Sequence, residues 1–192
     1  MRDRVVLDVE IQKTIEETPG GWGSSDLLGV AVAVLYEYET DRFRIYGPED
    51  VERLRHRLLQ AEEIIGFNIV KFDLPVIWGI SQEEWQGSVL RAELLPRCND
   101  LLRRIWQALG HDPDVFDART HCGWSLGVVA NGTLGVGKIG YGGDAPKWYQ
   151  AGQWARVVNY CVDDVALERD LSDFVDRYGY VVNGKTDQIV SL

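Results

Sequence analysis

The chain has 192 residues, of which 45% are hydrophobic, and its 30 acidic and 20 basic residues give a net charge of −10. This length and composition predict one globular domain over residues 1–192 and exclude a disordered or collagen-like chain. The acidic balance argues against a protein that coats nucleic acid through a basic surface. It still permits an enzyme that holds the end of a strand through bound cations.

Targeting and cysteine patterns point to a reduced, aqueous environment. The first ten residues, MRDRVVLDVE, are too short and too acidic for a signal peptide, and no apolar run is long enough to cross a bilayer. We therefore expect a cytoplasmic protein without membrane contact. Cys98, Cys122 and Cys161 form no CxxC pair and are odd in number, which predicts free thiols and no zinc site.

The first part of the chain alternates apolar strand patterns with one helical pattern. Strands are predicted at residues 5–9, 28–36, 43–46 and 63–67. A helix is predicted from Pro48 to about Ala61, and its apolar face would consist of Val51, Leu54, Leu58 and Leu59.

The rest of the chain is predicted to be mainly helical. Helical segments are expected at 72–79, 100–109 and 125–130, a glycine-rich loop at 132–143, and a long final helix from near 152 to near 178. The stretch 81–98 is ambiguous, and a terminal hairpin would turn at Asn183-Gly184. This order predicts an α/β (or α+β) domain whose mixed central sheet is flanked by helices.

The first candidate motif is Asp8-Val9-Glu10, on the first predicted strand. Side chains two residues apart on a strand point to the same face. Two carboxylates on an otherwise apolar strand are costly to bury without a partner, and a divalent cation is a natural one. Taken alone, the pattern favours a strand end with solvated carboxylates.

The second candidate motif is the segment GFNIVKFDLP at residues 66–75. Asp73 follows the fourth predicted strand at the opening of a helix, where the sites of α/β proteins tend to lie. The alternatives are that Asp73 only caps the short helix and that Asn68 is only a turn residue. The pattern alone supports both interpretations about equally.

The third candidate motif is YCVDD at residues 160–164, on the final predicted helix. Its apolar stripe consists of Val157, Val158, Cys161 and Val165. At about 100° per residue, Asp164 lies roughly 90° from the centre of the stripe, whereas Asp163 points away from it. Tyr160 precedes Asp164 by one turn and stands beside it. The helix geometry therefore selects Asp164 as the inward-facing carboxylate.

In this order and on these elements, the three segments resemble the exonuclease motifs of the DEDD superfamily of 3′–5′ exonucleases. Those motifs are Asp-x-Glu on the first strand, Asn-x3-Phe-Asp after the fourth, and Tyr-x3-Asp on the last helix. Ser125-Leu126, Thr133-Leu134-Gly135 and Lys138 add a similarity to small bacterial and archaeal predicted 3′–5′ exonucleases. Proofreading domains of family-B DNA polymerases resemble the chain more distantly. The resemblance covers nearly the whole chain and implies a ribonuclease H-like fold.

The resemblance also implies roles for individual residues. The four metal-binding carboxylates would be Asp8, Glu10, Asp73 and Asp164. Tyr160 would position the attacking water or help to deprotonate it. Asn159 stands where the other branch of the superfamily has histidine, so the chain resembles the tyrosine branch. Asn68 and Lys138 are the candidate substrate-binding residues.

The expected chemistry follows from a site built only from oxygen ligands. Such a site favours Mg²⁺ or Mn²⁺ over zinc, and two of these cations about 4 Å apart can activate a water and stabilise a leaving oxygen. The expected reaction removes nucleoside 5′-monophosphates from the 3′ end of DNA or RNA, with a single-stranded substrate favoured. Close carboxylates should also repel one another and raise at least one pKa. Trp148 or Trp154 could stack on a terminal base, although packing is the more common role of tryptophan.

Several alternatives stay open at this level. One is another metal-dependent nuclease on the same fold. Another is a non-catalytic, nuclease-like module that binds a helicase or polymerase partner. A protein partner in replication, repair or RNA processing is compatible with either. The letters of Gly135-x-Gly137-x-x-Gly140 match a dinucleotide-binding fingerprint, but their loop context favours a mobile loop near the cleft.

Overall fold

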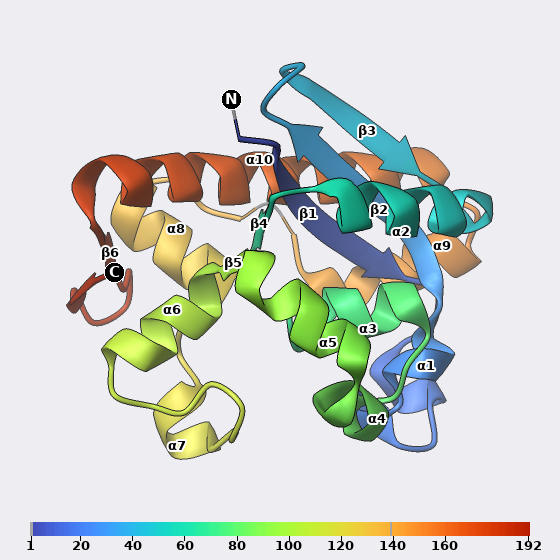
Figure 1. The fold of residues 1–192 in the computed structure, drawn as a ribbon, viewed down its shortest axis with the longest axis horizontal. Helices are drawn as coiled ribbons and strands as arrows, with labels where there is room; N and C mark the ends of the chain where they lie inside the picture. Colours follow the sequence, from blue (N-terminus) through green and yellow to red (C-terminus); the bar gives the residue numbers. More distant parts are fainter. Residues whose placement is uncertain (1, 139) are drawn as a thin grey trace.

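The computed structural model describes residues 2–138 and 140–192, and its centre is a mixed five-stranded sheet flanked by helices (Figure 1). The strand order is β3-β2-β1-β4-β5. The strands are β1 (Arg4–Ile11), β2 (Val30–Glu37), β3 (Arg42–Tyr46), β4 (Glu63–Gly66) and β5 (Cys98–Asp100). β1 pairs antiparallel with β2 and parallel with β4. The predicted α/β class with a mixed, helix-flanked sheet is confirmed.

The helices fall into long and short groups. The longer ones are α2 (Val51–Gln60), α6 (Leu101–Ala108), α8 (Leu126–Leu134) and α10 (Trp154–Tyr178). The shorter ones are α1 (Ser25–Leu28), α3 (Asp73–Trp78), α4 (Gln82–Gly87), α5 (Val89–Leu94), α7 (Ala118–His121) and α9 (Ala145–Gln150). Single 3-10 turns lie at Ile15–Glu17, Gly21–Gly23, Pro48–Asp50, Leu95–Arg97 and Gly142–Asp144. None of the helices in the described part of the chain combines the length and apolar character that a bilayer crossing requires.

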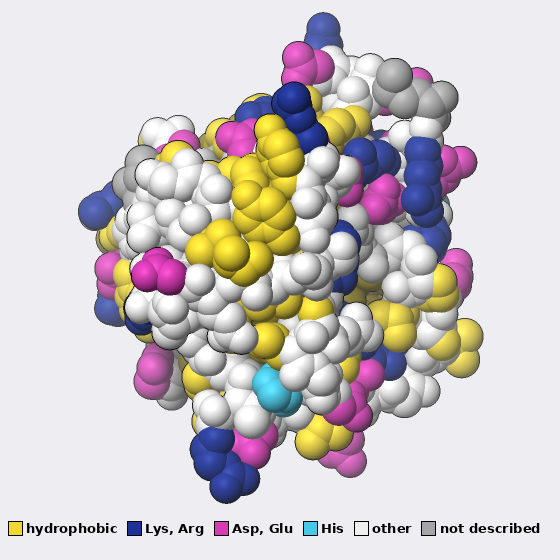
Figure 2. All heavy atoms as spheres, turned by 90° about the vertical axis from the view of Figure 1, so that its left-hand side faces the viewer, with side chains coloured by type: hydrophobic (Ala, Val, Ile, Leu, Met, Phe, Trp, Pro, Cys, Tyr) yellow, Lys and Arg dark blue, Asp and Glu magenta, His cyan; other side chains and the backbone are white. Residues whose placement is uncertain are grey.

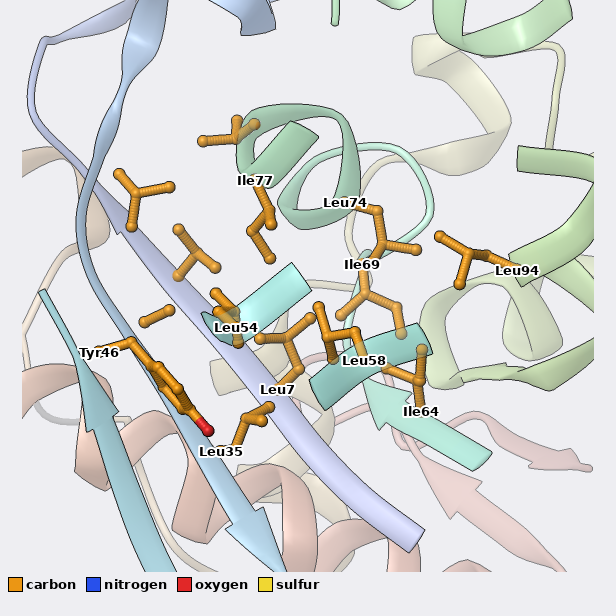
Figure 3. Packing of buried hydrophobic residues seen from close by; sticks show 14 of the residues in the cluster. Leu7, Leu35, Tyr46, Leu54, Leu58, Ile64, Ile69, Leu74, Ile77 and Leu94 are labelled. Carbon is orange, nitrogen blue, oxygen red and sulfur yellow. The ribbon is translucent and has the colours of Figure 1, made fainter. Parts of the chain in front are cut away.

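The alternation of side chains along β1 builds a separate core on each face of the sheet. Leu7 points to one face, where it packs in a cluster with Leu54 and Leu58 of α2 (Figure 3). Val6 points to the other face, in a cluster that includes Val165 of α10. Even-numbered positions of β1 therefore face α10.

A third apolar cluster joins α6, α8, the C-terminal half of α10 and a small hairpin. The hairpin consists of β6 (Tyr180–Val182) and β7 (Ile189–Ser191). Ile105, Val129 and Leu171 are fully buried in this cluster. Figure 2 views this end of the molecule and shows apolar side chains gathered in a strip on its surface.

The strand predictions agree with β1 to β4 apart from small shifts at their ends. β5 was missed, because a strand of three residues shows no period in the sequence. The helix predicted after Pro48 begins as a 3-10 turn and continues as α2, and the placement of Leu59 on its packing face was wrong, since Leu59 is 40% exposed.

The helical part differs from the prediction mainly in its shorter elements. The ambiguous stretch 81–98 contains α4 and α5, and α9 was not predicted. The loop predicted at 132–143 begins only after α8, whose C-cap is Gly135 at φ 71°. The long final helix is confirmed as α10, and the terminal hairpin is confirmed with a longer turn at 183–188.

Candidate metal centre

Three carboxylates from two elements converge beside the sheet. Asp8 and Glu10 lie on the face of β1 that is turned toward α10, and Asp164 lies on α10. One carboxylate oxygen from each of the three lies within 4.8 Å of the other two. Asp164 is buried and Asp163 is exposed, as the helix geometry predicted. The structure therefore brings three of the four predicted metal ligands into one cluster.

The fourth predicted ligand, Asp73, lies at the first position of α3 and outside that group of three. It is 3% exposed and lines the same pocket as Asp8 and Asp164. Burial raises the pKa of Asp73 well above its usual range, and the charges of Asp8 and Asp100 raise it further. All four predicted ligands thus border one pocket, with Asp73 in the electrostatic field of Asp8.

Asp100, which the sequence analysis did not single out, fixes the turn that delivers Asp73. Its carboxylate accepts hydrogen bonds from the backbone N–H groups of Asn68 at 2.9 Å and Val70 at 3.0 Å. The same carboxylate caps α6 by accepting from the N–H of Leu102. Asn68 takes the left-handed conformation at φ 72°, which asparagine tolerates better than most residues. The position before a helix was the one signal of this cap in the sequence.

Tyr160 is buried beside the glycine-rich loop. Its hydroxyl lies near Lys138 and Asp164 but has no hydrogen-bond partner of good geometry among the described residues. The loop approaches so closely that a Cβ at Gly140 would lie 3.1 Å from the Tyr160 ring, and one at Gly142 would lie 3.5 Å from the hydroxyl. Burial raises the pKa of Tyr160, so the phenol stays protonated at neutral pH. The structure leaves a buried hydroxyl that still needs a polar partner.

Lys138 reaches from this loop into the carboxylate cluster. Its Nζ lies 2.7 Å from Oδ2 of Asp164 and 5.1 Å from the centre of the Tyr160 ring. Burial would lower the pKa of Lys138, but the carboxylates of Asp164 and Asp8 outweigh it and the pKa is raised. The predicted substrate-binding lysine is thus paired with a predicted metal ligand, whereas Asn68 lines the pocket without such a partner.

Burial and mutual repulsion together disfavour the charged forms of these acids. Burial is the largest cause of the raised pKa at Asp8, Glu10 and Asp164. The charge of Asp8 raises the pKa values of Glu10 and Asp164 further, and the pKa of Asp164 reaches about 7. The expected rise in pKa is therefore present, but repulsion is its second cause and burial its first.

Glu168 is a fifth acid that the sequence analysis missed. It follows Asp164 by one helical turn on α10, is 1% exposed, and its Oε2 has no hydrogen-bond partner among the described residues. Burial and then the charges of Asp8, Asp73 and Asp164 raise its pKa well above the usual range. The four-residue spacing from Asp164 was the signal that could have found it.

The donor set fits a hard divalent cation. Asp8, Glu10 and Asp164 offer only carboxylate oxygens, and buried acids that lack a full set of partners gain most from a cation. Cys161 lies alongside and donates from Sγ to Oδ2 of Asp8 at 3.3 Å. Burial raises the pKa of its thiol well above the usual range, which disfavours the thiolate that a softer metal would require.

Two other features of the sequence, the candidate stacking tryptophans and the glycine-rich segment, border this site in different ways. Trp148 packs edge-on against Tyr160 at 5.6 Å and Trp154 against Tyr149 at 5.0 Å, and neither is among the residues lining the pocket. The segment with the dinucleotide-fingerprint letters follows the helix α8, whereas the fingerprint requires a preceding strand.

No family model matches the chain, and no curated protein matches it.

Proposed function

We propose that this chain is a metal-dependent 3′–5′ exonuclease of the DEDD type, in the tyrosine branch, with a ribonuclease H-like fold. It would hydrolyse the phosphodiester bond at the 3′ end of DNA or RNA and release nucleoside 5′-monophosphates. The observation that carries the proposal is the convergence of Asp8, Glu10 and Asp164, with one oxygen from each within 4.8 Å of the others, beside Asp73 in one pocket. The sheet order and the packing of α10 against the strand that bears two of these acids support the fold assignment.

The ligands of the site would be Asp8, Glu10, Asp73 and Asp164, and they suit two Mg²⁺ or Mn²⁺ ions. Such a pair of cations, when bound, activates the attacking water and neutralises charge on the leaving 3′ oxygen. The burial of Glu10, Asp73 and Asp164 keeps the local dielectric low, which strengthens their interaction with cations.

Tyr160 would act as a positioning group. Because its raised pKa keeps the phenol protonated, Tyr160 orients the attacking water by hydrogen bonding and does not serve as a phenolate base. Its unpartnered hydroxyl is free to make that bond.

The proposal is tested with single-stranded DNA and RNA oligonucleotides labelled at the 5′ end, incubated with Mn²⁺ or with EDTA. We expect a ladder that shortens from the 3′ end only with Mn²⁺. Asp8→Asn should abolish it, and Asp163→Asn, a matched change at an exposed acid on α10, should leave it intact. A folded protein that neither cleaves nor binds Mn²⁺ would contradict the proposal and indicate the non-catalytic partner-binding module.

A further inference from the structure

Two exposed aromatic rings stand at the mouth of the carboxylate pocket. Trp22 is 67% exposed and Tyr141 is 73% exposed, and both line the pocket together with Asp73 and Asp164. They come from different segments, because Trp22 lies in the 3-10 turn after β1 and Tyr141 lies in the loop between α8 and α9. Large flat rings at the entrance of a polar pocket are suited to stacking on planar ligands.

The segment that carries Trp22 is held in place by hydrogen bonds. Thr18 Oγ1 donates to the carbonyl of Gly21 at 3.1 Å, and Gln150 of α9 donates to Oε2 of Glu17 at 2.9 Å. The Trp22 ring also meets Phe72, the residue before Asp73, edge-on with centroids 5.6 Å apart. A ring held by these contacts has fewer orientations to lose when a ligand binds, which reduces the entropic cost of binding.

The charges of the pocket offer little direct attraction to phosphate. Its lining cations are Lys138 and Lys147, and both are ion-paired, with Asp164 at 2.7 Å and with Asp144 at 3.0 Å. No arginine is among the described residues that line it. With a net charge of −10, the protein needs a source of affinity that does not depend on basic side chains.

We propose that Trp22 and Tyr141 form an aromatic clamp that stacks on unpaired nucleobases at the 3′ end of a single strand. This inference rests on the proposed exonuclease function and names its substrate class. The clamp would hold the end of the strand so that its last phosphodiester reaches the carboxylates of the pocket. Stacking accepts every base, so binding should be tolerant of sequence. Because both lysines of the pocket are ion-paired, few phosphate contacts are expected, and binding should depend weakly on salt.

The clamp is tested by equilibrium binding of 5′-fluorescein single-stranded oligonucleotides in Ca²⁺, with their intactness checked by gel in the same samples. One oligonucleotide is intact and the other lacks only its 3′-terminal base. The variants are Trp22→Ala, Trp22→Phe and Tyr141→Ala. Trp154→Ala is the matched control, because Trp154 is a partly exposed tryptophan that packs on Tyr149 and is not among the residues lining the pocket.

We expect the unaltered protein to bind the intact end roughly tenfold or more tightly than the abasic end, as one stacked base would give. Trp22→Ala and Tyr141→Ala should weaken binding of the intact end and reduce this discrimination, Trp22→Phe should retain most of it, and Trp154→Ala should match the unaltered protein. The slope of log affinity against log salt should stay below about 1.4 in magnitude, the value for two phosphate contacts on a single strand.

Three results would overturn the clamp. The first is equal binding of intact and abasic ends, and the second is that the Trp22→Ala and Tyr141→Ala variants bind like the unaltered protein. If the 3′–5′ ladder is still produced, either result would overturn only the clamp. The proposed function would then stand with another mode of substrate binding. Absence of both oligonucleotide binding and cleavage would overturn the clamp together with the exonuclease proposal.

Discussion

The ammonium group of Lys138 lies beside the carboxylates of the pocket and partly compensates their negative charge. Its Nζ is 2.7 Å from Oδ2 of Asp164, and the charges of Asp164 and Asp8 raise its pKa. A divalent cation held by these acids would compete with Lys138 for the same oxygen. Lys138 would therefore stabilise the metal-free cluster and have to move when the proposed cations bind.

Removal of this charge should favour metal binding. We expect Lys138→Met to bind Mn²⁺ roughly tenfold more tightly in the absence of nucleic acid, because a neutral side chain neither competes for Asp164 nor repels a cation. Isothermal titration calorimetry with Mn²⁺ measures this directly. Lys147→Met is the matched control, since Lys147 pairs with Asp144 and not with a member of the cluster. Weaker or unchanged Mn²⁺ affinity in Lys138→Met would show that the two cations do not compete.

At the scale of an element, the end of β4 is restricted by a glycine. A Cβ on Gly66 would lie 2.7 Å from the carbonyl oxygen of Leu7 on β1, and it would also meet the side chain of Ile69. Glu168 is next to the same position, with its Oε2 3.4 Å from that Cβ. Gly66 therefore allows β4 to approach β1 closely just before the turn that leads to Asp73.

Gly66→Ala should lower the free energy of unfolding by about 1–3 kcal/mol, because a backbone carbonyl cannot move aside as a flexible side chain can. Urea denaturation followed by circular dichroism measures the change. Gly87→Ala at the end of α4 is the control, since a Cβ there meets nothing within 4 Å and alanine favours the helix. If both variants lose equal stability, close packing at Gly66 is not the cause.

The elements that could be predicted from the sequence were mainly those in which the apolar pattern continues over many residues. The apolar runs of β1 and β2 and the stripe along α10 located the strands and helix that carry Asp8, Glu10 and Asp164. β5 has three residues, too few to establish a period. The roles of Asp100 and Glu168 were missed for another reason. Their carboxylates are buried by segments that are distant in the sequence, and a local sequence pattern does not show this burial.

At the scale of the whole molecule, the acids divide into two groups with opposite effects on stability. Glu37 and Asp114 are paired with arginines, which hold their pKa values below the usual range even though burial opposes this. The acids of the pocket have raised pKa values, and burial is the first cause. Paired acids stabilise the fold once they are charged, whereas the pocket acids destabilise the metal-free fold as they become charged.

The metal-free protein should therefore lose stability as pH rises from about 5.5 to about 8. The pKa of Asp164 is about 7 in the fold against 3.8 for the ordinary group, so the folded state binds more protons across this interval and its free energy of unfolding falls with rising pH. This one group contributes a loss of about 2 kcal/mol between about pH 5.5 and its folded pKa. The arginine-paired acids are already charged throughout the interval and do not offset the loss.

Chemical denaturation in EDTA at the two pH values measures this loss of stability, and Asp164→Asn should reduce the difference. Because bound cations compensate the charged acids, Mn²⁺ should stabilise the protein more at the higher pH. Stability that rises with pH in EDTA would mean that the pocket acids are already compensated without metal.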